Sequence, residues 1–253
     1  MNKTLMIIVM ILMTVSFLAA AQPTGIHSSW DMLLKKHVFN GKVNYKGFIA
    51  DKAKLVAYLQ KLDKADISAY SQKKKLAFWI NAYNAYTVKL IVDNYPLKSI
   101  RDLSSPWKKK ICNVAGETVS LDHIENEILR KEFSEPRIHF AIVCAAVGCP
   151  DLQPFAYRGD QIEAQLGTTA RKFFTSPKHF KVIGDEEDGR YIFIHISEIF
   201  KWFGDDFGAN KKAWVRFFIP YSEGENLGLL ENAETIRIKY LKYNWSLNDK
   251  ATR

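Results

Sequence analysis

The stretch from Pro136 to Leu152 reads P-R-I-H-F-A-I-V-C-A-A-V-G-C-P-D-L and holds one histidine and two of the chain's three cysteines. Its middle part, residues 138–143, is rich in branched and aromatic residues, which predicts a buried β-strand. Gly148 and Pro150 then break this pattern. Reactive side chains at the end of a rigid element and in the loop that follows are typical of functional sites, so we expect the site here.

Side chains alternate between the two faces of a strand, so His139 and Cys144 are expected on opposite faces. The extended chain between them would span roughly 16 Å, and a direct pair between this imidazole and this thiol is therefore not expected. The loop that follows leaves two arrangements open. It brings Cys149 back toward Cys144, or it carries Cys149 to the other face, near His139.

Each of these residues also has an ordinary structural interpretation. Free cysteines are among the most buried residue types, and Cys144 and Cys149 in an exported protein are also compatible with a short-loop disulfide. A histidine in a strand is most often a satisfied core or edge residue. Cys112 has no acid or base neighbour along the chain, and the odd number of cysteines leaves at least one thiol free unless two molecules pair.

Residues 1–21 have the organisation of a secretory signal peptide. Lys3 precedes an uncharged apolar stretch, and the small residues Ala19 and Ala21 suit cleavage after Ala21. An uncleaved membrane anchor is the alternative, although the apolar run is shorter than the ~20 residues that a spanning helix needs. Because no later segment is long and apolar enough to cross a membrane, we expect a periplasmic or secreted protein.

The remaining residues, 22–253, show no linker and are expected to form a single domain. The net charge of +9, or +8 once Lys3 is removed with the signal peptide, comes from scattered lysines and from runs at residues 73–75 and 108–110. Such runs are usually solvated faces, and an envelope polyanion is the functional alternative. Nucleic acid is not an expected partner in that compartment. No pair of histidines has metal-ligand spacing, so neither a metal nor another cofactor is expected.

The strongest helix pattern covers residues 72–94, is apolar on nearly all sides and ends before Pro96, which predicts a central buried helix. Asn81 and Asn84 lie three residues apart and share one face of it. Buried amides are costly unless they are hydrogen-bonded. These two either clamp neighbouring backbone or face a polar cleft, where they would bind substrate.

The other periodic segments mix helices and strands without βαβ regularity, which predicts an α+β fold with several helices around a small mixed or antiparallel sheet. Helices are expected at residues 26–38, 51–62, 122–130, 160–174, 197–203 and 213–218. Strands are expected at residues 43–45, 111–120, 180–183, 191–196 and 236–248. Residues 111–120 are expected to form one hairpin, and residues 180–183 and 191–196 together a second one. Glu125 lies beside the inner face of its helix, and His195 is a competing candidate base at the end of a strand.

Four motifs together resemble a known family: F-W-I-N-A-Y-N-A, L-D-H-I-E-N-E-I-L-R, P-R-I-H-F-A-I-V-C-A-A-V-G-C-P and Y-N-W-S-L-N, at residues 78–85, 121–130, 136–150 and 243–248. They look like the family of domain of unknown function 547, over nearly all of residues 22–253. The resemblance implies exported bacterial proteins of one compact domain, with a likeness to papain-type and transglutaminase-type thiol enzymes. The family's glutamate, histidine and cysteines carry over as Glu125, His139, Cys144 and Cys149. Where family members carry I-E-H, this chain has Asn126, although His123 is close by.

We therefore expect a thiol-dependent hydrolase or acyltransferase that acts on amide or peptide bonds, with an envelope peptide as the natural substrate. Cys144 would attack a carbonyl, a histidine would accept a proton, and Arg137 would bind a substrate carboxylate. The alternative is a non-catalytic periplasmic interaction module with a structural Cys144–Cys149 disulfide. A redox role ranks third, because the C-x-x-C spacing of thiol oxidoreductases is absent.

Overall fold

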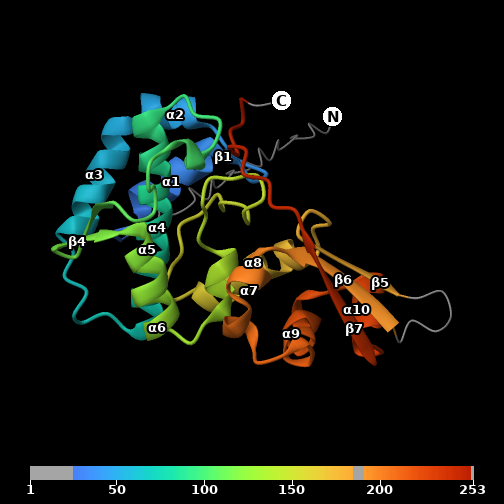
Figure 1. Cartoon of the computed structure of the whole chain (residues 1–253). Helices are drawn as coiled ribbons and strands as arrows, with labels where there is room; N and C mark the ends of the chain where they lie inside the picture. The colour runs from blue at the N-terminus through green and yellow to red at the C-terminus, as the bar shows by residue number, and fades with distance from the viewer. Residues whose placement is uncertain (1–24, 185–190, 252–253) are drawn as a thin grey trace, which may run out of the picture.

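The computed structural model describes residues 25–184 and 191–251 (Figure 1), so the expected signal peptide lies outside the described residues. The N-terminal part comprises α1 (Ser28–His37), β1 (Val38–Phe39), β2 (Lys42–Val43), α2 (Tyr45–Ala50), α3 (Lys52–Asp63) and α4 (Gln72–Asn94). The middle part comprises η1 (Ile100–Asp102), β3 (Lys110–Val114), β4 (Glu117–Ser120), α5 (Leu121–His123), η2 (Ile124–Leu129), α6 (Arg130–Glu132) and η3 (Pro136–Phe140). The C-terminal part comprises α7 (Ile162–Phe174), β5 (Phe180–Gly184), β6 (Tyr191–Ser197), α8 (Ile199–Trp202), η4 (Gly204–Phe207), α9 (Lys211–Phe218), η5 (Ile219–Tyr221), α10 (Gly224–Glu231) and β7 (Thr235–Leu241).

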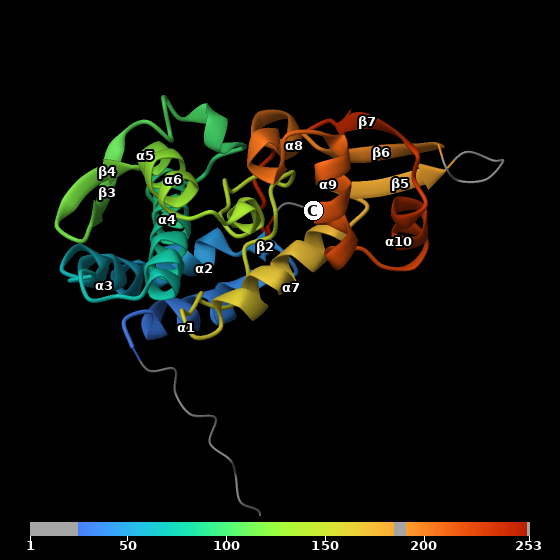
Figure 2. The same cartoon turned by 90° about the horizontal axis from the view of Figure 1, so that it is seen from below.

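Helix α4 is the centre of the helical half of the molecule, as the sequence predicts. The Ser71 hydroxyl accepts a hydrogen bond from the Lys74 amide at its N-terminus. Residues on every side of the helix between Leu76 and Val92 are buried, because α2, α3 and the π-helix η2 all pack against it. Figures 1 and 2 show α4 enclosed by these elements, with the sheet of β5, β6 and β7 at the opposite end of the molecule.

Within the described residues the strands form three small separate sheets, which confirms the α+β class. The pairs β1–β2 and β3–β4 are antiparallel, and the third sheet has the order β5-β6-β7. In that sheet β5 is antiparallel to β6, whereas β7 is parallel to it. Helices α8, α9 and α10 supply the long crossover that a parallel connection requires.

The strand predicted at residues 138–143 is wrong. These residues form the 3₁₀-helix η3 and a following turn, with Pro136 at the start of the helix. The Asn84 amide donates to the Ala141 carbonyl at 2.9 Å and its oxygen accepts from the Val143 amide at 3.0 Å. Backbone groups that would need a partner strand are therefore satisfied by a side chain. The apolar pattern arises because Phe140 packs on the aromatic core, with its ring centroid 4.5 Å from that of Phe173.

The segment after β4 is helical, as predicted, but its middle residues adopt a π-helix over Ile124–Leu129. The Ser120 hydroxyl caps its start by accepting the His123 amide at 3.1 Å. π-Helical turns are rare and are frequent at functional sites. In this chain the π-helix carries Glu125.

Two other segments differ from the sequence prediction. Tyr45 begins helix α2 instead of ending a strand, and the last strand ends at Leu241. The residues that follow it pair with the loop after Cys144 instead of extending the sheet. The amides of Val147 and Gly148 donate to the carbonyls of Ser246 and Asn244, both at 2.8 Å.

Candidate active site

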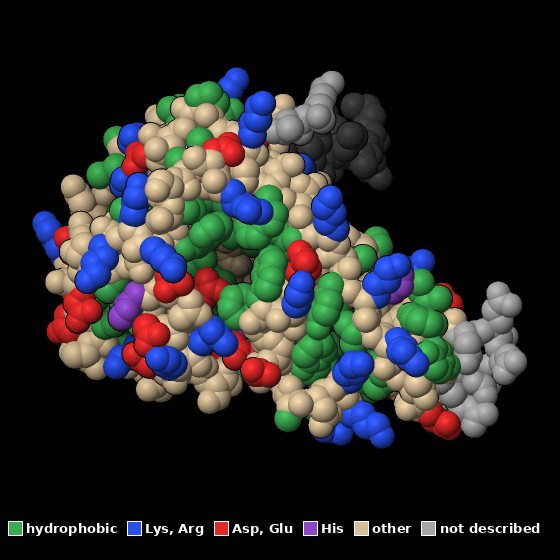
Figure 3. All heavy atoms as spheres, in the orientation of Figure 1, with side chains coloured by type: hydrophobic (Ala, Val, Ile, Leu, Met, Phe, Trp, Pro, Cys, Tyr) green, Lys and Arg blue, Asp and Glu red, His purple; other side chains and the backbone are tan. Residues whose placement is uncertain are grey.

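A pocket of about 480 Å³ lies where the helical half meets the C-terminal part of the chain. Figure 3 shows it as a hollow near the middle of this face, surrounded by hydrophobic side chains. Its walls come from α4, α5, η2, η3, α8, the loops around them and residues 243–248 after β7, which we call the C-terminal segment. The lining includes the side chains of Tyr83, Trp107, Asp122, Glu125, Asn126, His139, Cys144, Cys149, Trp202, Phe203, Tyr243 and Trp245. A larger hollow of about 980 Å³ between α1 and α7 contains no cysteine, so the chemistry favours the smaller one.

Cys144 and His139 both line this pocket, which overturns the expectation that they face opposite ways. That expectation depended on an extended strand, whereas the 3₁₀-helix and the turn bring the two ends of the segment to one side. The loop brings Cys149 back to Cys144, which is the first of the two arrangements that the sequence left open. The Cys144 amide donates to the Cys149 sulfur at 2.9 Å.

The Cys144 thiolate has three hydrogen-bond donors. The Cys149 thiol, the Tyr243 hydroxyl and the Ala146 amide all lower the pKa of Cys144, against the opposing effects of burial and of Glu125. The Tyr243 oxygen lies 3.1 Å from the Cys144 sulfur. Burial and the neighbouring Cys144 charge raise the pKa of Cys149. The two thiols are therefore unequal, and Cys144 is the one that carries a negative charge more readily.

The backbone after Cys144 is held in an unusual conformation. Ala145 has a φ of +60°, in the left-handed region that side chains other than glycine disfavour. The C-terminal segment fixes this turn, because the Asn248 amide donates to the Ala145 carbonyl at 3.0 Å. A Cβ atom at Gly148 would come within 2.7 Å of the Asn244 backbone nitrogen, so only glycine allows the two segments to approach. The segment that carries Tyr243 is thereby locked beside Cys144.

Glu125 is a second ionisable group in the pocket. The Tyr83 hydroxyl of α4 donates to its Oε2 atom at 3.0 Å. Burial raises the pKa of Glu125 to about 7, although Tyr83 and Arg130 both favour its charged form. Close to neutral pH this carboxyl therefore exists in both protonation states, as a proton-transferring group requires.

His139 is oriented by a carboxylate that the sequence analysis gave no role. Its Nε2 atom lies 2.7 Å from Oδ2 of Asp206, and its ring stacks on Phe203 at a centroid distance of 4.5 Å. Burial lowers the pKa of His139, against the effect of Asp206, while the hydrogen bond from His139 lowers the pKa of Asp206. The neutral imidazole therefore donates from Nε2 to an ionised Asp206, and its Nδ1 atom is left as a free acceptor.

Asp206 is itself held by Arg130. The guanidinium donates from Nε to Oδ2 at 2.6 Å and from Nη2 to Oδ1 at 2.9 Å, and its Nη1 atom donates to the Asn126 side chain at 2.8 Å. Asn126 in turn donates to Asp122 at 3.2 Å. Asn126, which stands where members of the family that the motifs resemble carry histidine, thus lies in the pocket wall. There its side chain links Arg130 to Asp122.

Aromatic side chains form one wall of the pocket. The ring centroids of Tyr243 and Trp245 lie 4.6 Å apart, those of Trp202 and Tyr243 lie 5.0 Å apart, and those of Trp107 and Trp245 lie 5.9 Å apart. Trp202 is 42% exposed. This wall gives the pocket an apolar mouth above a polar interior, an arrangement common in small-molecule sites.

The two central-helix asparagines do not line the pocket. Asn81 donates to the Tyr157 carbonyl at 2.8 Å and accepts from the Tyr157 amide at 2.9 Å. Asn84 binds the backbone of the turn before Cys144 in the same way, as described above. Of the two roles that the sequence allowed, the structure has the backbone clamp.

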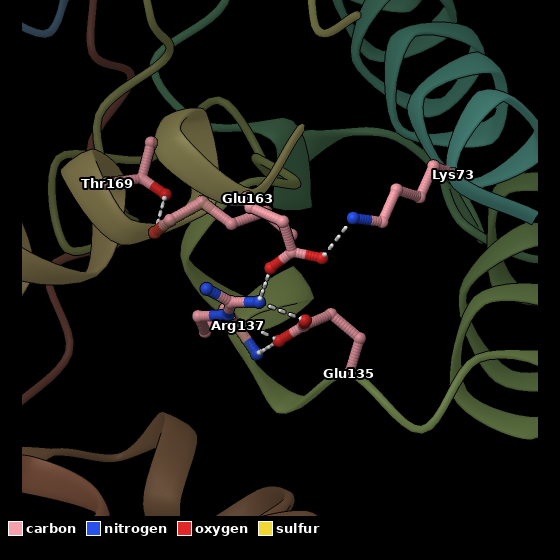
Figure 4. A network of polar contacts seen from close by, with 6 residues as sticks. Lys73, Glu135, Arg137, Glu163 and Thr169 are labelled. Atoms are coloured by element: carbon pink, nitrogen blue, oxygen red, sulfur yellow. Dashed lines mark hydrogen bonds and ion pairs between the residues drawn. The ribbon is translucent and has the colours of Figure 1, made fainter. Parts of the chain in front are cut away.

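Arg137 also lies outside the pocket. Figure 4 shows it between two carboxylates. Its Nε atom donates to Glu135 at 2.7 Å, and its Nη2 atom donates to Glu163 at 2.7 Å. These partners raise the pKa of Arg137, mainly through the hydrogen bonds to Glu135. Its guanidinium stabilises the start of η3 and the start of α7, and the substrate-binding role predicted for it has no support in this position.

The remaining candidates are separate from this pocket. His195 lies in the middle of the three-stranded sheet, and Cys112 is fully buried, where burial raises its pKa to about 12. All three cysteines are free thiols in this structure. Across the described residues no group of three or more histidine, cysteine or acidic side chains has the arrangement to hold a metal ion.

The sequence analysis assigned no function to Tyr83 and Tyr243, which line the pocket, or to Asp206 and Arg130, which hold His139 in place. Tyr243 lies in one of the motifs that carry the family resemblance, so its position in a motif could have identified it. Tyr83 lies within another. Asp206 had a weaker signal, as the second residue of an acidic pair after an aromatic helix.

Comparisons with known proteins identify a family for the middle of the chain. No curated protein and no solved structure matches the chain. No helix among the described residues is long and apolar enough to cross a membrane. A family model matches residues 67–174, so the C-terminal motif at residues 243–248 lies outside the matched part. That model is described as "Protein of unknown function, DUF547", and the matched part of the chain, with α4, Glu125, His139 and both pocket cysteines, belongs to this family.

Proposed function

We propose that the protein is a thiol-dependent hydrolase or acyltransferase that acts on amide or peptide bonds, with Cys144 as its nucleophile. The observation that carries this proposal is the environment of the Cys144 sulfur, which lines a pocket and has three donors that stabilise its thiolate. A thiolate is the reactive form of cysteine. A buried structural cysteine needs no such donors, as Cys112 illustrates by its raised pKa.

In the first step the Cys144 thiolate attacks the substrate carbonyl carbon and forms a carbon–sulfur bond, while the carbonyl π electrons move to the oxygen. The Tyr243 hydroxyl and the Ala146 amide, which stabilise the thiolate, lose that partner as the sulfur becomes neutral and are available near the new oxyanion. Collapse of the oxyanion then breaks the carbon–nitrogen bond. The product is an acyl-thioester on Cys144.

The departing amine needs a proton, and Glu125 is the group best suited to give it. With a pKa of about 7, a large fraction of Glu125 is protonated near neutral pH. The ionised carboxylate opposes the thiolate electrostatically, so the favourable pair is a thiolate at Cys144 with a neutral Glu125. After proton donation the charge passes from Cys144 to Glu125.

His139 would act in the second step. Its Nδ1 atom is an acceptor because Asp206 holds the proton-bearing Nε2 atom. It accepts a proton from the water that attacks the thioester, or from an acceptor hydroxyl or amine if the reaction is an acyl transfer. The tetrahedral intermediate then collapses, the carbon–sulfur bond breaks, and Cys144 leaves as the thiolate. The proton on His139 passes through solvent to the Glu125 carboxylate, which restores the starting state. An aspartate-oriented histidine in the same pocket as a reactive cysteine is the arrangement that the likeness to papain-type and transglutaminase-type enzymes implies.

We propose an envelope peptide as the substrate class and a periplasmic or secreted location. Support for the location comes from residues 1–21 alone, whose pattern is that of a cleaved signal peptide. The N-terminal sequence of protein from the envelope fraction should begin near Gln22. An intact Met1 in the membrane fraction would contradict export with cleavage.

The catalytic proposal is tested by trapping the acyl-enzyme. The protein is incubated with small 4-nitrophenyl esters, and mass spectrometry locates the acyl group. We expect one acyl group on Cys144, no adduct in Cys144→Ala, and an unchanged adduct in the matched variant Cys112→Ala. Turnover that survives Cys144→Ala would contradict the proposal.

A non-catalytic module with a Cys144–Cys149 disulfide is the second candidate, because contact between the two cysteines would allow oxidation. Mass spectrometry of non-reduced protein, alkylated on isolation, distinguishes the two. A disulfide in the isolated protein favours the module. Free thiols at Cys144 and Cys149, as in the structure, favour the enzyme.

A further inference from the structure

The three-stranded sheet has one covered face and one open face. Helix α10 contacts β5, and α9 and α10 lie on one side of the sheet (Figure 2). The inward side chains of β5 and β6 are buried. The outward side chains of the three strands are Lys181, Ile183, Tyr191, Phe193, His195, Thr235, Arg237 and Lys239.

The pairing register places a lysine on either side of one histidine. Lys181 pairs with His195, and His195 pairs with Lys239, so these three side chains form one row across the sheet. Burial lowers the pKa of His195, and the positive charges of Lys239 and Lys181 on either side lower it further.

Among the described residues, no counter-charge lies within the open face. Its outward residues include no carboxylate, and Lys181 and Lys239 form no ion pair within the part of the chain that the structure describes. Glu234, just before β7, has an interaction of its own. The acidic residues 185–188 lie outside the described residues and are not included in this face.

The neighbouring row is apolar and exposed. Ile183 pairs with Phe193, and Phe193 pairs with Arg237. Ile183 is 38% exposed and Phe193 is 41% exposed, and the Tyr191 ring lies 5.3 Å from that of Phe193. Figure 3 shows hydrophobic, basic and histidine side chains beside one another at this end of the molecule. Exposed apolar side chains next to basic ones are typical of an interaction surface.

We propose that this open sheet face binds an anionic phospholipid surface. Lys181, Lys239 and Arg237 would contact lipid phosphates, and Ile183 and Phe193 would enter the boundary between headgroups and acyl chains. A soluble polyanion matches the charges, but it gives no reason for the exposed aliphatic side chain of Ile183 on the edge strand β5, which has no flat ring on which a base or sugar could stack. This surface is independent of the pocket, and so is its test.

The experiment measures co-sedimentation of the protein, as isolated from its host, with vesicles of phosphatidylcholine alone or with phosphatidylglycerol added. We expect binding only to the anionic vesicles and a decrease with salt. The double variant Lys181→Gln, Lys239→Gln should bind about 25-fold more weakly, since each basic residue near an anionic membrane contributes about fivefold. The matched double variant Lys211→Gln, Lys212→Gln on α9 loses the same charge and should bind as the unchanged protein does.

The apolar row separates a lipid surface from a soluble polyanion. Ile183→Ser with Phe193→Ser should weaken vesicle binding by at least about tenfold and leave binding to dextran sulfate unchanged. Unchanged thermal unfolding of each variant confirms that the fold is intact. The proposal would be overturned if the Lys211→Gln, Lys212→Gln control lost as much vesicle binding as the Lys181→Gln, Lys239→Gln variant. It would also be overturned if the apolar substitutions left vesicle binding unchanged.

Discussion

The ionisation of Cys144 depends on individual donors, and Tyr243 can be removed without loss of its ring. In Tyr243→Phe the thiolate loses the hydroxyl that lies 3.1 Å from its sulfur. A hydrogen bond to a charged group contributes ~1.5 kcal/mol or more, so the pKa of Cys144 should rise and its alkylation at pH 7 should slow about tenfold. Iodoacetamide labelling followed by mass spectrometry measures this. Tyr95→Phe, which removes a hydroxyl bound to Asp249 instead, is the control and should leave the rate unchanged.

Glu125 should impose a pH dependence on stability. Its pKa rises from 4.5 to about 7 in the folded protein, so the folded state holds this proton more tightly than the unfolded state does. The contribution is neutral below pH 4.5 and becomes increasingly unfavourable as the pH rises toward 7, up to about 3 kcal/mol. Glu125→Gln removes it and can still accept from Tyr83. Denaturant unfolding should show the variant gaining stability relative to the parent between pH 5 and pH 8, and a constant difference across that range would contradict the raised pKa.

At the scale of elements, the turn after Cys144 and the C-terminal segment act as a pair. Gly148→Ala should separate them, because the new methyl group would come within 2.7 Å of the Asn244 backbone nitrogen. Steric insertion of this kind typically costs ~1–3 kcal/mol. We expect a lower melting temperature and slower Cys144 labelling, since Tyr243 moves with its segment. Gly228→Ala in α10, where a Cβ meets nothing within 4 Å, is the matched control and should not lower stability.

Helix α4 holds the same turn from its other side. Asn84→Leu would leave the Ala141 carbonyl and the Val143 amide without partners, at about 1–3 kcal/mol for each buried group. Thermal unfolding should show this loss, whereas Asn232→Leu, at an exposed amide, should change little. A melting temperature equal to that of the parent would rule out the clamp as a stabilising feature.

At the scale of the whole molecule, the sequence predicts elements best where the chain's own periodicity decides them. The central helix from Gln72 to Asn94 and the hairpin around Gly116 are confirmed, because a long apolar helix and a two-strand turn are specified by local residues. The segment at residues 138–143 is different. Its apolar pattern fits a strand, but its backbone partners come from Asn84, which is distant along the chain, and local pattern carries no information on that contact.

For the candidate site, too, the sequence predicted the local features but not the contacts between distant segments. Cys144, Cys149, His139 and Glu125 could be selected from residue type and motif, and the structure brings all four to one pocket. Their chemical roles could not be assigned, because the roles depend on Tyr243, Asp206 and Tyr83, which other segments supply. The strand interpretation also gave the wrong relation between His139 and Cys144. A single error in local conformation was enough to separate two residues that the fold places together.

The central claim is that Cys144 carries its negative charge more readily than an ordinary cysteine, and the rate of alkylation of each cysteine as a function of pH tests it most directly. Iodoacetamide should modify Cys144 in the folded protein much faster than Cys149 or Cys112, because burial raises the pKa of both. The Cys144 rate should rise through a midpoint below the pKa of a free cysteine. Equal, slow modification of all three cysteines, or a Cys144 midpoint above that of a free cysteine, would contradict the account.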